Sequence, residues 1–212
     1  MMKGISSINK KLIMALSGAG LSLFLLIHMA GNASTFLGRQ AFISYSSHLH
    51  ALGPLIKLSE AGLLGLFLIH IVFGVSLFVE NLQARPHGYA VKKSAGGRTW
   101  GSATMPYTGA ITLLFLLIHL KNFHFSGLSV NIADLLLLNL ENPLLAGYYL
   151  LSLLAITLHI SHGFWSIFQT LGLSHPNFNG KIRCAALSTS LLTGLVFVLI
   201  PLCVLFSRQF LR

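Results

Sequence analysis

Five long apolar stretches, separated by polar connections, dominate the hydropathy pattern of this chain. They cover residues 12–32, 58–80, 103–120, 143–171 and 184–206. About 20 consecutive apolar residues are enough to cross the roughly 30 Å hydrocarbon core of a bilayer as a helix. The pattern therefore predicts an all-α fold, with residues 1–212 forming one domain built as a bundle of five transmembrane helices.

The segments between and within these stretches differ in character. Residues 33–57 form a polar connection. The connection before the fourth stretch contains the apolar run DLLLLNL, which is too short to cross a membrane and is expected at its interface. Pro143 favours a helix start at that position. Pro201 is expected to interrupt the fifth helix, which carries no histidine and is expected to pack or to face lipid.

The composition supports a membrane protein and changes how the charge is interpreted. Of 212 residues, 54% are hydrophobic and 8% are charged, yet the formal net charge is +10. The basic residues cluster in the connections, nine on the side of the N-terminus and five on the other side, as the positive-inside rule expects. We therefore expect a multi-pass protein of the cell inner (cytoplasmic) membrane, with a cytoplasmic N-terminus and no nucleic-acid partner.

The cysteines and the missing motifs limit the chemistry. Cys184 and Cys203 lie on one predicted helix, about 28 Å apart, and cannot pair with each other. The chain has no C-x-x-C-H motif for covalent haem attachment, no cysteine cluster for iron–sulfur ligation and no glycine-rich phosphate-binding motif. Chemistry on a soluble substrate would therefore need another subunit.

Histidines inside the predicted membrane helices are the main functional signal. An ionisable side chain in the membrane is costly without a partner, and imidazole is the usual axial ligand of a b-type haem between helices. His70 and His159 each lie about ten residues, or ~15 Å, before the cytoplasmic end of their helix. His28 and His119 lie near the opposite end of theirs. Depth therefore predicts two level pairs, His28 with His119 and His70 with His159.

Other roles remain open for the neighbouring residues. Interhelical hydrogen bonding is an alternative for any single histidine, although four histidines on four helices, paired in depth, favour ligation. Gly74 and Gly163 each follow a paired histidine by four residues, which leaves room either for a flat macrocycle or for close helix packing. His162 lies partly on a different face and is expected to hydrogen bond or to contact a haem propionate.

Four sequence blocks carry a resemblance to a known family. They are HMAGN with His28, HIVFG and ENLQARPHGY around and after His70, FLLIHL with His119, and LHISHGFWSIFQTLG with His159. With them the chain resembles the dihaem cytochrome b membrane-anchor subunit of succinate dehydrogenases and fumarate reductases, of the type with five helices in one polypeptide. The resemblance covers essentially the whole chain, and its last block is the most specific.

The resemblance implies a cofactor set, partners and a function. The four paired histidines match the axial ligands of two b haems in that family. A flavoprotein and an iron–sulfur protein are expected on the cytoplasmic side, with menaquinone as the usual lipid substrate. The chain would pass electrons between the iron–sulfur subunit and the quinone without itself acting on succinate, and its sequence does not fix the direction. Thr157 stands where some members carry an acid, so a proton route through that helix is not supported.

Two rival functions have distinguishable signatures. The dihaem quinol cytochrome b of a hydrogenase or formate dehydrogenase shares the bundle but not the ARP and HGFWSxFQTLG blocks. A transporter that uses histidines for protons or metal ions would usually carry intramembrane carboxylates as well. Here only Glu60 and Glu80 qualify, and both lie at helix ends.

Residues near each membrane face are candidates for the remaining contacts. Haem propionates need donors, and candidates on the inner side are Ser17, Arg98, Trp100 and Gln169, although interfacial anchoring explains such residues equally well. At the outer end, Glu60 is the best candidate for handling protons at a quinone site, with Asn32 and Tyr45 as weaker ones. The basic loop from Asn81 to Arg98 is the expected docking surface for the iron–sulfur subunit, or a contact with anionic lipid.

Overall fold

The computed structural model describes residues 5–84, 100–207 and 209–212, and within these residues all regular structure is helical. Five helices are long and apolar enough to cross a membrane, as the sequence predicted. They are α1 (Ser7–Ala33), α3 (Pro54–Gln83), α4 (Trp100–His119), α6 (Pro143–Thr170) and α7 (Asn179–Phe206). Four short elements extend or join them in the described part of the chain: η1 (Ser34–Leu37), α2 (Arg39–His50), a π-helical turn η2 (Leu120–His124) and α5 (Ile132–Leu140).

Local capping explains where several helices begin. The Ser6 hydroxyl accepts a hydrogen bond from the Asn9 backbone N–H and starts α1. Asn142 caps α6 in the same way, and Pro143 occupies the first turn as expected. The Asn131 side chain caps α5 by accepting from the Asp134 backbone N–H.

The structure departs from the sequence prediction at two places. The expected polar connection 33–57 contains a further helix, α2 (Arg39–His50), whose Phe42 is buried. Its polar composition hid it, because one buried face is sufficient to hold a helix of three turns against its neighbours. The second departure is at Pro201, which does not interrupt α7: the helix runs from Asn179 to Phe206 with Pro201 inside it.

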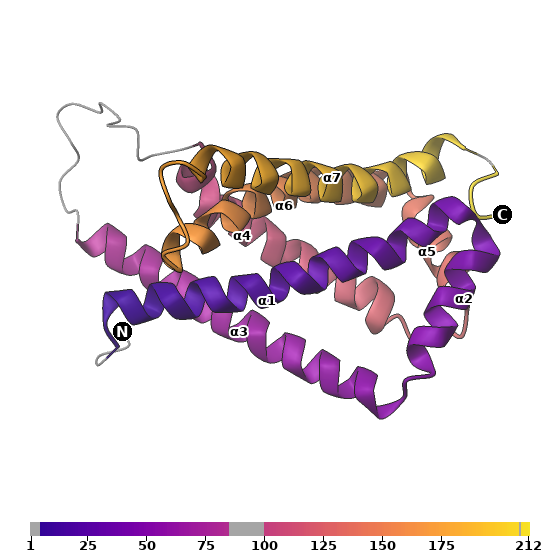
Figure 1. Cartoon of the computed structure of the whole chain (residues 1–212). Coiled ribbons are helices and arrows are strands. Elements are labelled where there is room, and N and C mark those ends of the chain that lie inside the picture. The colour runs from indigo at the N-terminus through magenta and orange to yellow at the C-terminus, as the bar shows by residue number, and fades with distance from the viewer. Residues whose placement is uncertain (1–4, 85–99, 208) are drawn as a thin grey trace.

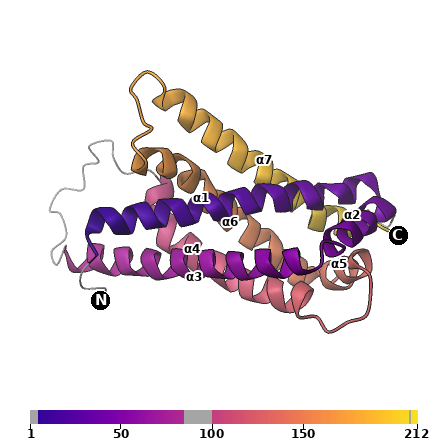
Figure 2. The same cartoon turned by 60° about the horizontal axis from the view of Figure 1, so that its bottom comes forward.

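The long helices form two groups that meet along α1 (Figures 1 and 2). α1 and α3 pack side by side, and α6 packs between α4 and α7. α1 also contacts α6 and α7, which joins the two groups. The short helices α2 and α5 lie together at one end of the bundle, called here the α5 end; α1 begins and α3 finishes at the opposite end.

The best-buried apolar cluster lies at the α5 end. It is formed by Phe42, Ala133, Leu136, Leu140, Tyr149, Ile200, Val204 and Leu211. Beside it, Arg39 of α2 donates to the Asp134 carboxylate of α5 at 2.6 Å and to the Leu211 carbonyl at 2.8 Å. The Arg39 guanidinium holds the pKa of Asp134 below its ordinary value through this hydrogen bond. α2, α5 and the C-terminal segment are thereby tied together.

At the opposite end, an ion pair joins α1 to α3. The ammonium group of Lys10, which is only 5% exposed, contacts the Glu80 carboxylate. The Ser76 hydroxyl donates to the same carboxylate at 3.2 Å. Because Lys10 is buried near the start of α1, it would be costly there without a partner.

The outward faces of the long helices carry large apolar side chains. Leu64, Leu68 and Leu151 are more than half exposed, and Phe206 is 83% exposed. Such a continuous apolar surface is unstable in water and suits a lipid environment. Together with the five spanning helices, it makes this chain a multi-pass membrane protein. The basic loop predicted from Asn81 to Arg98 lies outside the described residues from residue 85 onward.

Candidate metal centre

The structure brings the four membrane histidines together in two pairs. The rings of His28 on α1 and His119 on α4 have their centroids 6.0 Å apart and lie nearly perpendicular, at 86°. The rings of His70 on α3 and His159 on α6 are 6.4 Å apart at 75°. These are the partners that the depth argument chose, and each pair joins the α1–α3 group to the α4–α6 group.

The ring separation suits two imidazoles that share one metal ion. A metal–imidazole nitrogen bond is about 2 Å, and a ring nitrogen is roughly 1.2 Å from its ring centre, so two axial ligands have centroids about 6.3 Å apart. The measured separations are 6.0 and 6.4 Å. No group of three or more His, Cys, Asp or Glu side chains that could hold a metal occurs in the described part of the chain. A pair of histidines supplies two ligands, which suits haem iron because its other four ligands come from the macrocycle.

The pair near the start of α1, His70 with His159, is held by two hydroxyl groups. Ser17 Oγ lies 3.2 Å from His70 Nδ1. Thr108 Oγ1 lies 3.2 Å from His159 Nδ1. Ser17 was expected to face a haem propionate, and the structure places its hydroxyl against the histidine ring. The sequence reasoning missed Thr108, although it occupies the same place on α4 that Ser17 occupies on α1.

The pair at the α5 end, His28 with His119, has a different surrounding. Phe24 stacks on His28 and Phe115 stacks on His119, with ring centroids 5.3 and 5.4 Å apart. The Asn32 amide lies 3.3 Å from His28 Nε2 and donates to the His28 carbonyl at 2.9 Å. His119 Nδ1 is buried without a hydrogen-bond partner among the described residues. A buried nitrogen without a partner is costly, and a metal ion bound at this nitrogen would offset that cost.

Space for a macrocycle differs between the two candidate glycines. A Cβ atom added at Gly163 would meet nothing within 4 Å, whereas one added at Gly74 would lie 3.1 Å from the Met14 methyl group. Met14 is an unbranched, flexible side chain that can shift. The glycine on α6 therefore faces open space, and the one on α3 faces a side chain that is easily displaced.

The other predicted propionate contacts are spread along the same end. The Gln169 side-chain amide donates to Asn179 Oδ1 at 3.1 Å, which ties the end of α6 to the start of α7. Trp100 begins α4, but its side chain and Arg98 fall outside the described residues. The His162 ring lies 5.9 Å from the Trp165 ring, and a Cβ atom added at Gly101 would lie 2.8 Å from His162 Cβ.

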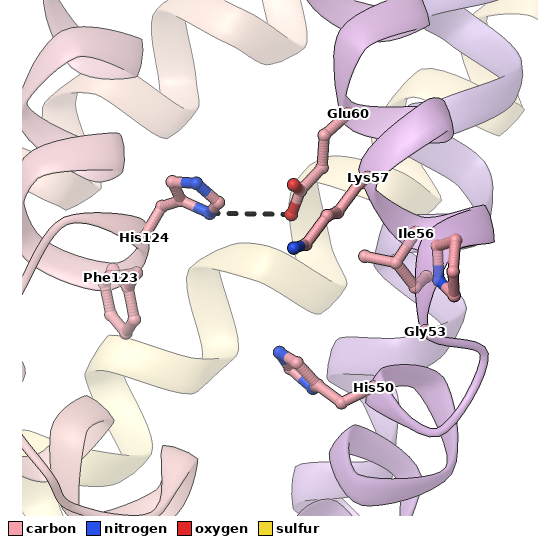
Figure 3. Close-up of a pocket in the computed structure, with 8 residues that line it drawn as sticks. His50, Gly53, Ile56, Lys57, Glu60, Phe123 and His124 are labelled. Atoms are coloured by element: carbon pink, nitrogen blue, oxygen red, sulfur yellow. Dashed lines mark ion pairs between the residues drawn. The ribbon is translucent and has the colours of Figure 1, made fainter.

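A polar pocket opens at the α5 end, where α2 meets α3 (Figure 3). It encloses about 480 Å³ and is lined by His50, Gly53, Pro54, Ile56, Lys57, Glu60, Phe123 and His124. His124 Nδ1 lies 3.6 Å from Glu60 Oε1 across the pocket. Phe123 connects the pocket with the histidine pair, because its ring lies 5.0 Å from the ring of His119.

Only one of the three predicted quinone residues lines this pocket. Glu60 does, whereas Asn32 contacts His28 and Tyr45 packs against Gly31, where an added Cβ atom would lie 2.5 Å from Tyr45 Cε1. His50, Lys57 and His124 were missed as pocket residues. They lie in polar connections or at helix ends, where histidine and lysine are common and carry little signal.

α7 closes the side of α6 that could have carried an acid. Thr157 donates to the Leu153 carbonyl at 2.8 Å. Gly194 of α7 lies so close that an added Cβ atom would overlap the Thr157 hydroxyl and methyl groups. A longer acidic side chain has no room at this interface.

Comparison with known proteins finds a relative of this chain. The chain is 29% identical over 157 residues to the succinate dehydrogenase cytochrome b558 subunit of Bacillus subtilis (strain 168), which covers 72% of this chain and 73% of that protein. No family model matches the chain, and no solved structure matches it. The resemblance predicted from the four sequence blocks is confirmed by this relative.

Proposed function

We propose that this chain is the membrane-anchor and electron-transfer subunit of a succinate:quinone oxidoreductase. Its similarity to a succinate dehydrogenase cytochrome b558 subunit supports the assignment to such a complex. The observation that carries the proposal is the arrangement of four histidines on four membrane helices. They form two pairs, His28 with His119 and His70 with His159, at different positions along the bundle. Two metal centres at different depths would provide a path for electrons across the bilayer.

Each histidine pair holds one b haem in this proposal. His70 and His159 hold the inner one, and His28 and His119 hold the outer one. A haem of this type supplies a one-electron carrier when bound. The protein would contribute the imidazole nitrogens of the four histidines, and the aromatic rings of Phe24 and Phe115 beside the outer pair.

The polar pocket at the α5 end is the proposed quinone site. Reduction of a quinone to a quinol consumes two electrons and two protons, so the site needs titratable groups beside the outer histidine pair. Glu60 and His124 face each other across the pocket at 3.6 Å, and Lys57 adds a cation that can donate to a quinone carbonyl. Asn32 on α1 and Tyr45 on α2, which do not line the pocket, are weaker candidates. Menaquinone is the expected quinone.

The orientation follows from the basic residues. With the N-terminus in the cytoplasm, the start of α1 faces the cytoplasm and the α5 end faces outward. A flavoprotein and an iron–sulfur protein would then dock on the cytoplasmic side, with the basic loop from Asn81 to Arg98 as the proposed docking surface for the iron–sulfur subunit. The same parts serve succinate oxidation or fumarate reduction.

An absorption spectrum of the purified protein, taken with and without dithionite, tests the proposal. Two reducible b haems are expected; a chain without haem would instead favour a histidine-dependent transporter. His70→Ala should remove one haem and His28→Ala the other, and these variants should differ in which spectral component they lose. Retention of both haems in either variant would show that its pair is not the ligand set. Copurification with hydrogenase or formate dehydrogenase subunits would favour the rival quinol cytochrome.

A further inference from the structure

α1 and α4 carry the same short pattern in front of their paired histidines. Residues 14–18 of α1 are MALSG and residues 105–109 of α4 are MPYTG. Both helices then reach an identical segment, FLLIH, at 24–28 and 115–119, which ends in His28 and His119. The hydroxyl residue and the glycine therefore occupy the same positions relative to the histidine in the two helices.

In both helices, this hydroxyl–glycine dipeptide contacts a histidine of the other pair. Ser17 Oγ lies 3.2 Å from His70 Nδ1, and an added Cβ atom at Gly18 would lie 3.2 Å from His70 Cε1. On α4, Thr108 Oγ1 lies 3.2 Å from His159 Nδ1, and an added Cβ atom at Gly109 would lie 3.3 Å from its Cε1. The hydroxyl meets one edge of the ring while the glycine lets that edge approach the helix backbone.

The hydroxyl protons are already committed to the helix backbone. Ser17 Oγ donates to the Met14 carbonyl at 3.1 Å. Thr108 Oγ1 donates to the Thr104 and Met105 carbonyls at 3.1 and 3.2 Å. Each Nδ1 therefore faces a hydroxyl oxygen whose own proton is directed to a backbone carbonyl, so this oxygen is left to accept. This arrangement selects the tautomer with the proton on Nδ1.

The consequence concerns the other ring nitrogen. When Nδ1 carries the proton, Nε2 has a free lone pair, and only a nitrogen with a free lone pair can bind a metal. A hydrogen bond from Nδ1–H to an acceptor also orients the ring and raises the basicity of the ligating nitrogen. If the hydroxyls instead donated to Nδ1, the proton would sit on Nε2 and ligation there would be blocked.

We propose that Ser17 and Thr108 are matched positioning residues that fix the tautomer, orientation and ligand strength of His70 and His159. The inference rests on the proposed ligand pairs. It separates the two centres, because the described contacts of His28 and His119 include an amide and aromatic rings but no hydroxyl. It also gives Ser17 a role at the ligand in place of a propionate contact.

The test compares hydroxyl-free and hydroxyl-retaining variants of the purified, haem-loaded protein. Ser17→Ala and Thr108→Val remove one hydrogen bond each, and Ser17→Thr and Thr108→Ser restore a hydroxyl. Ser190→Ala and Thr193→Val are matched controls, because both hydroxyls are buried and donate to carbonyls of α7, at 2.8 Å each. Redox titration followed at the two b-haem bands gives one midpoint potential for each haem.

A weaker ligand field stabilises the oxidised iron less, so loss of the hydrogen bond should raise one of the two potentials. A three- to tenfold change in the oxidised-to-reduced ratio is expected from one hydrogen bond, and tenfold corresponds to about 59 mV for one electron. Only the haem that His70→Ala removes should shift. The second haem and the α7 controls should not change, and the hydroxyl-retaining variants should stay within a third of the full shift.

Several outcomes would overturn the proposal. Unchanged potentials in Ser17→Ala and Thr108→Val would show that the hydroxyls do not act on the ligands, while the haem pairs themselves would stand. Equal shifts of both haems, or equal shifts in the α7 controls, would indicate general loosening of the bundle. The hydroxyl-free variants could also lose a haem. Loss of the inner haem alone, with that haem retained in Ser17→Thr and Thr108→Ser, supports the proposal. Equal loss of haem in the conservative variants overturns it. Absence of haem from the unsubstituted protein would instead remove the proposed function.

Discussion

Gly194→Ala tests how tightly α7 closes the α6 helix. The added Cβ atom would overlap Thr157 Oγ1 and would lie 2.8 Å from Thr157 Cγ2 and 3.1 Å from Thr157 Cβ. Because the Cβ atom of Thr157 is fixed by its backbone, rotation of that side chain relieves only part of the overlap. α6 and α7 must then move apart, and these two helices form the most extensive contact between any elements described.

Two opposing terms set the magnitude. Overpacking of a well-packed interface costs about 1–3 kcal/mol. Replacing glycine by alanine within a helix returns roughly 0.8–1 kcal/mol through helix propensity. Gly194→Ala should therefore destabilise the protein by about 0–2 kcal/mol. Gly147→Ala on α6 is the matched control, because an added Cβ atom there meets nothing within 4 Å and only the favourable term applies.

Equilibrium unfolding of the detergent-solubilised, haem-loaded protein, followed by loss of helical circular dichroism, measures the difference. Gly194→Ala should be less stable than Gly147→Ala by about 1–3 kcal/mol. In a Thr157→Ala background most of this difference should disappear, with a coupling of about 1–2 kcal/mol between the two sites. Equal stabilities of the two glycine variants, or a double variant in which the effects simply add, would refute the close approach of α7 to Thr157.

Three further predictions concern the ends of the bundle. Lys10→Met should lower the thermal midpoint more than the double variant Lys10→Met with Glu80→Gln, because the single change leaves a carboxylate without its cation; the reverse order would contradict the ion pair. The pKa of Asp134 is lowered in the folded protein. Its contribution to stability should therefore be complete above the unfolded pKa of about 3.9 and be lost as the pH falls through the lower folded value. Thermal melting as a function of pH should show this dependence, and Asp134→Asn should remove it. If the quinone site is on the outer side, the two electrons from succinate cross the membrane potential, which is worth roughly 4–5 kcal/mol at ~100 mV. An uncoupler should therefore slow succinate oxidation by the membrane quinone but spare succinate oxidation by a soluble dye, and equal rates with and without uncoupler would place the site on the inner side. Glu60→Gln should likewise affect only the reaction with the quinone.

The sequence predicted the parts of the fold that depend on solvent preference. Five apolar stretches gave the five spanning helices, and the first turn of α6 was located by Pro143. Periodicity did not predict α2, because its burial rests on Phe42 and on contacts with two other elements. One of them, α5, lies far away in the sequence, and contact with the other, η1, depends on the turn that joins it to α2. Pro201 shows the same limit, since neighbouring helices can maintain a helix around a proline in a membrane protein.

At the candidate site, depth in the membrane predicted which histidines meet, but not what holds them. Depth is a one-dimensional quantity that helix length and charge bias define from sequence alone. The contacts of Ser17 and Thr108 depend on the rotation of α1 and α4 about their axes, which no single helix determines. The matching MALSG and MPYTG segments are nevertheless visible in the sequence. Two helices that present a hydroxyl and a glycine at the same distance from a ligand histidine would be expected to treat the opposite histidine pair in the same way. Internal similarity between helices therefore carries the rotational information that hydropathy lacks.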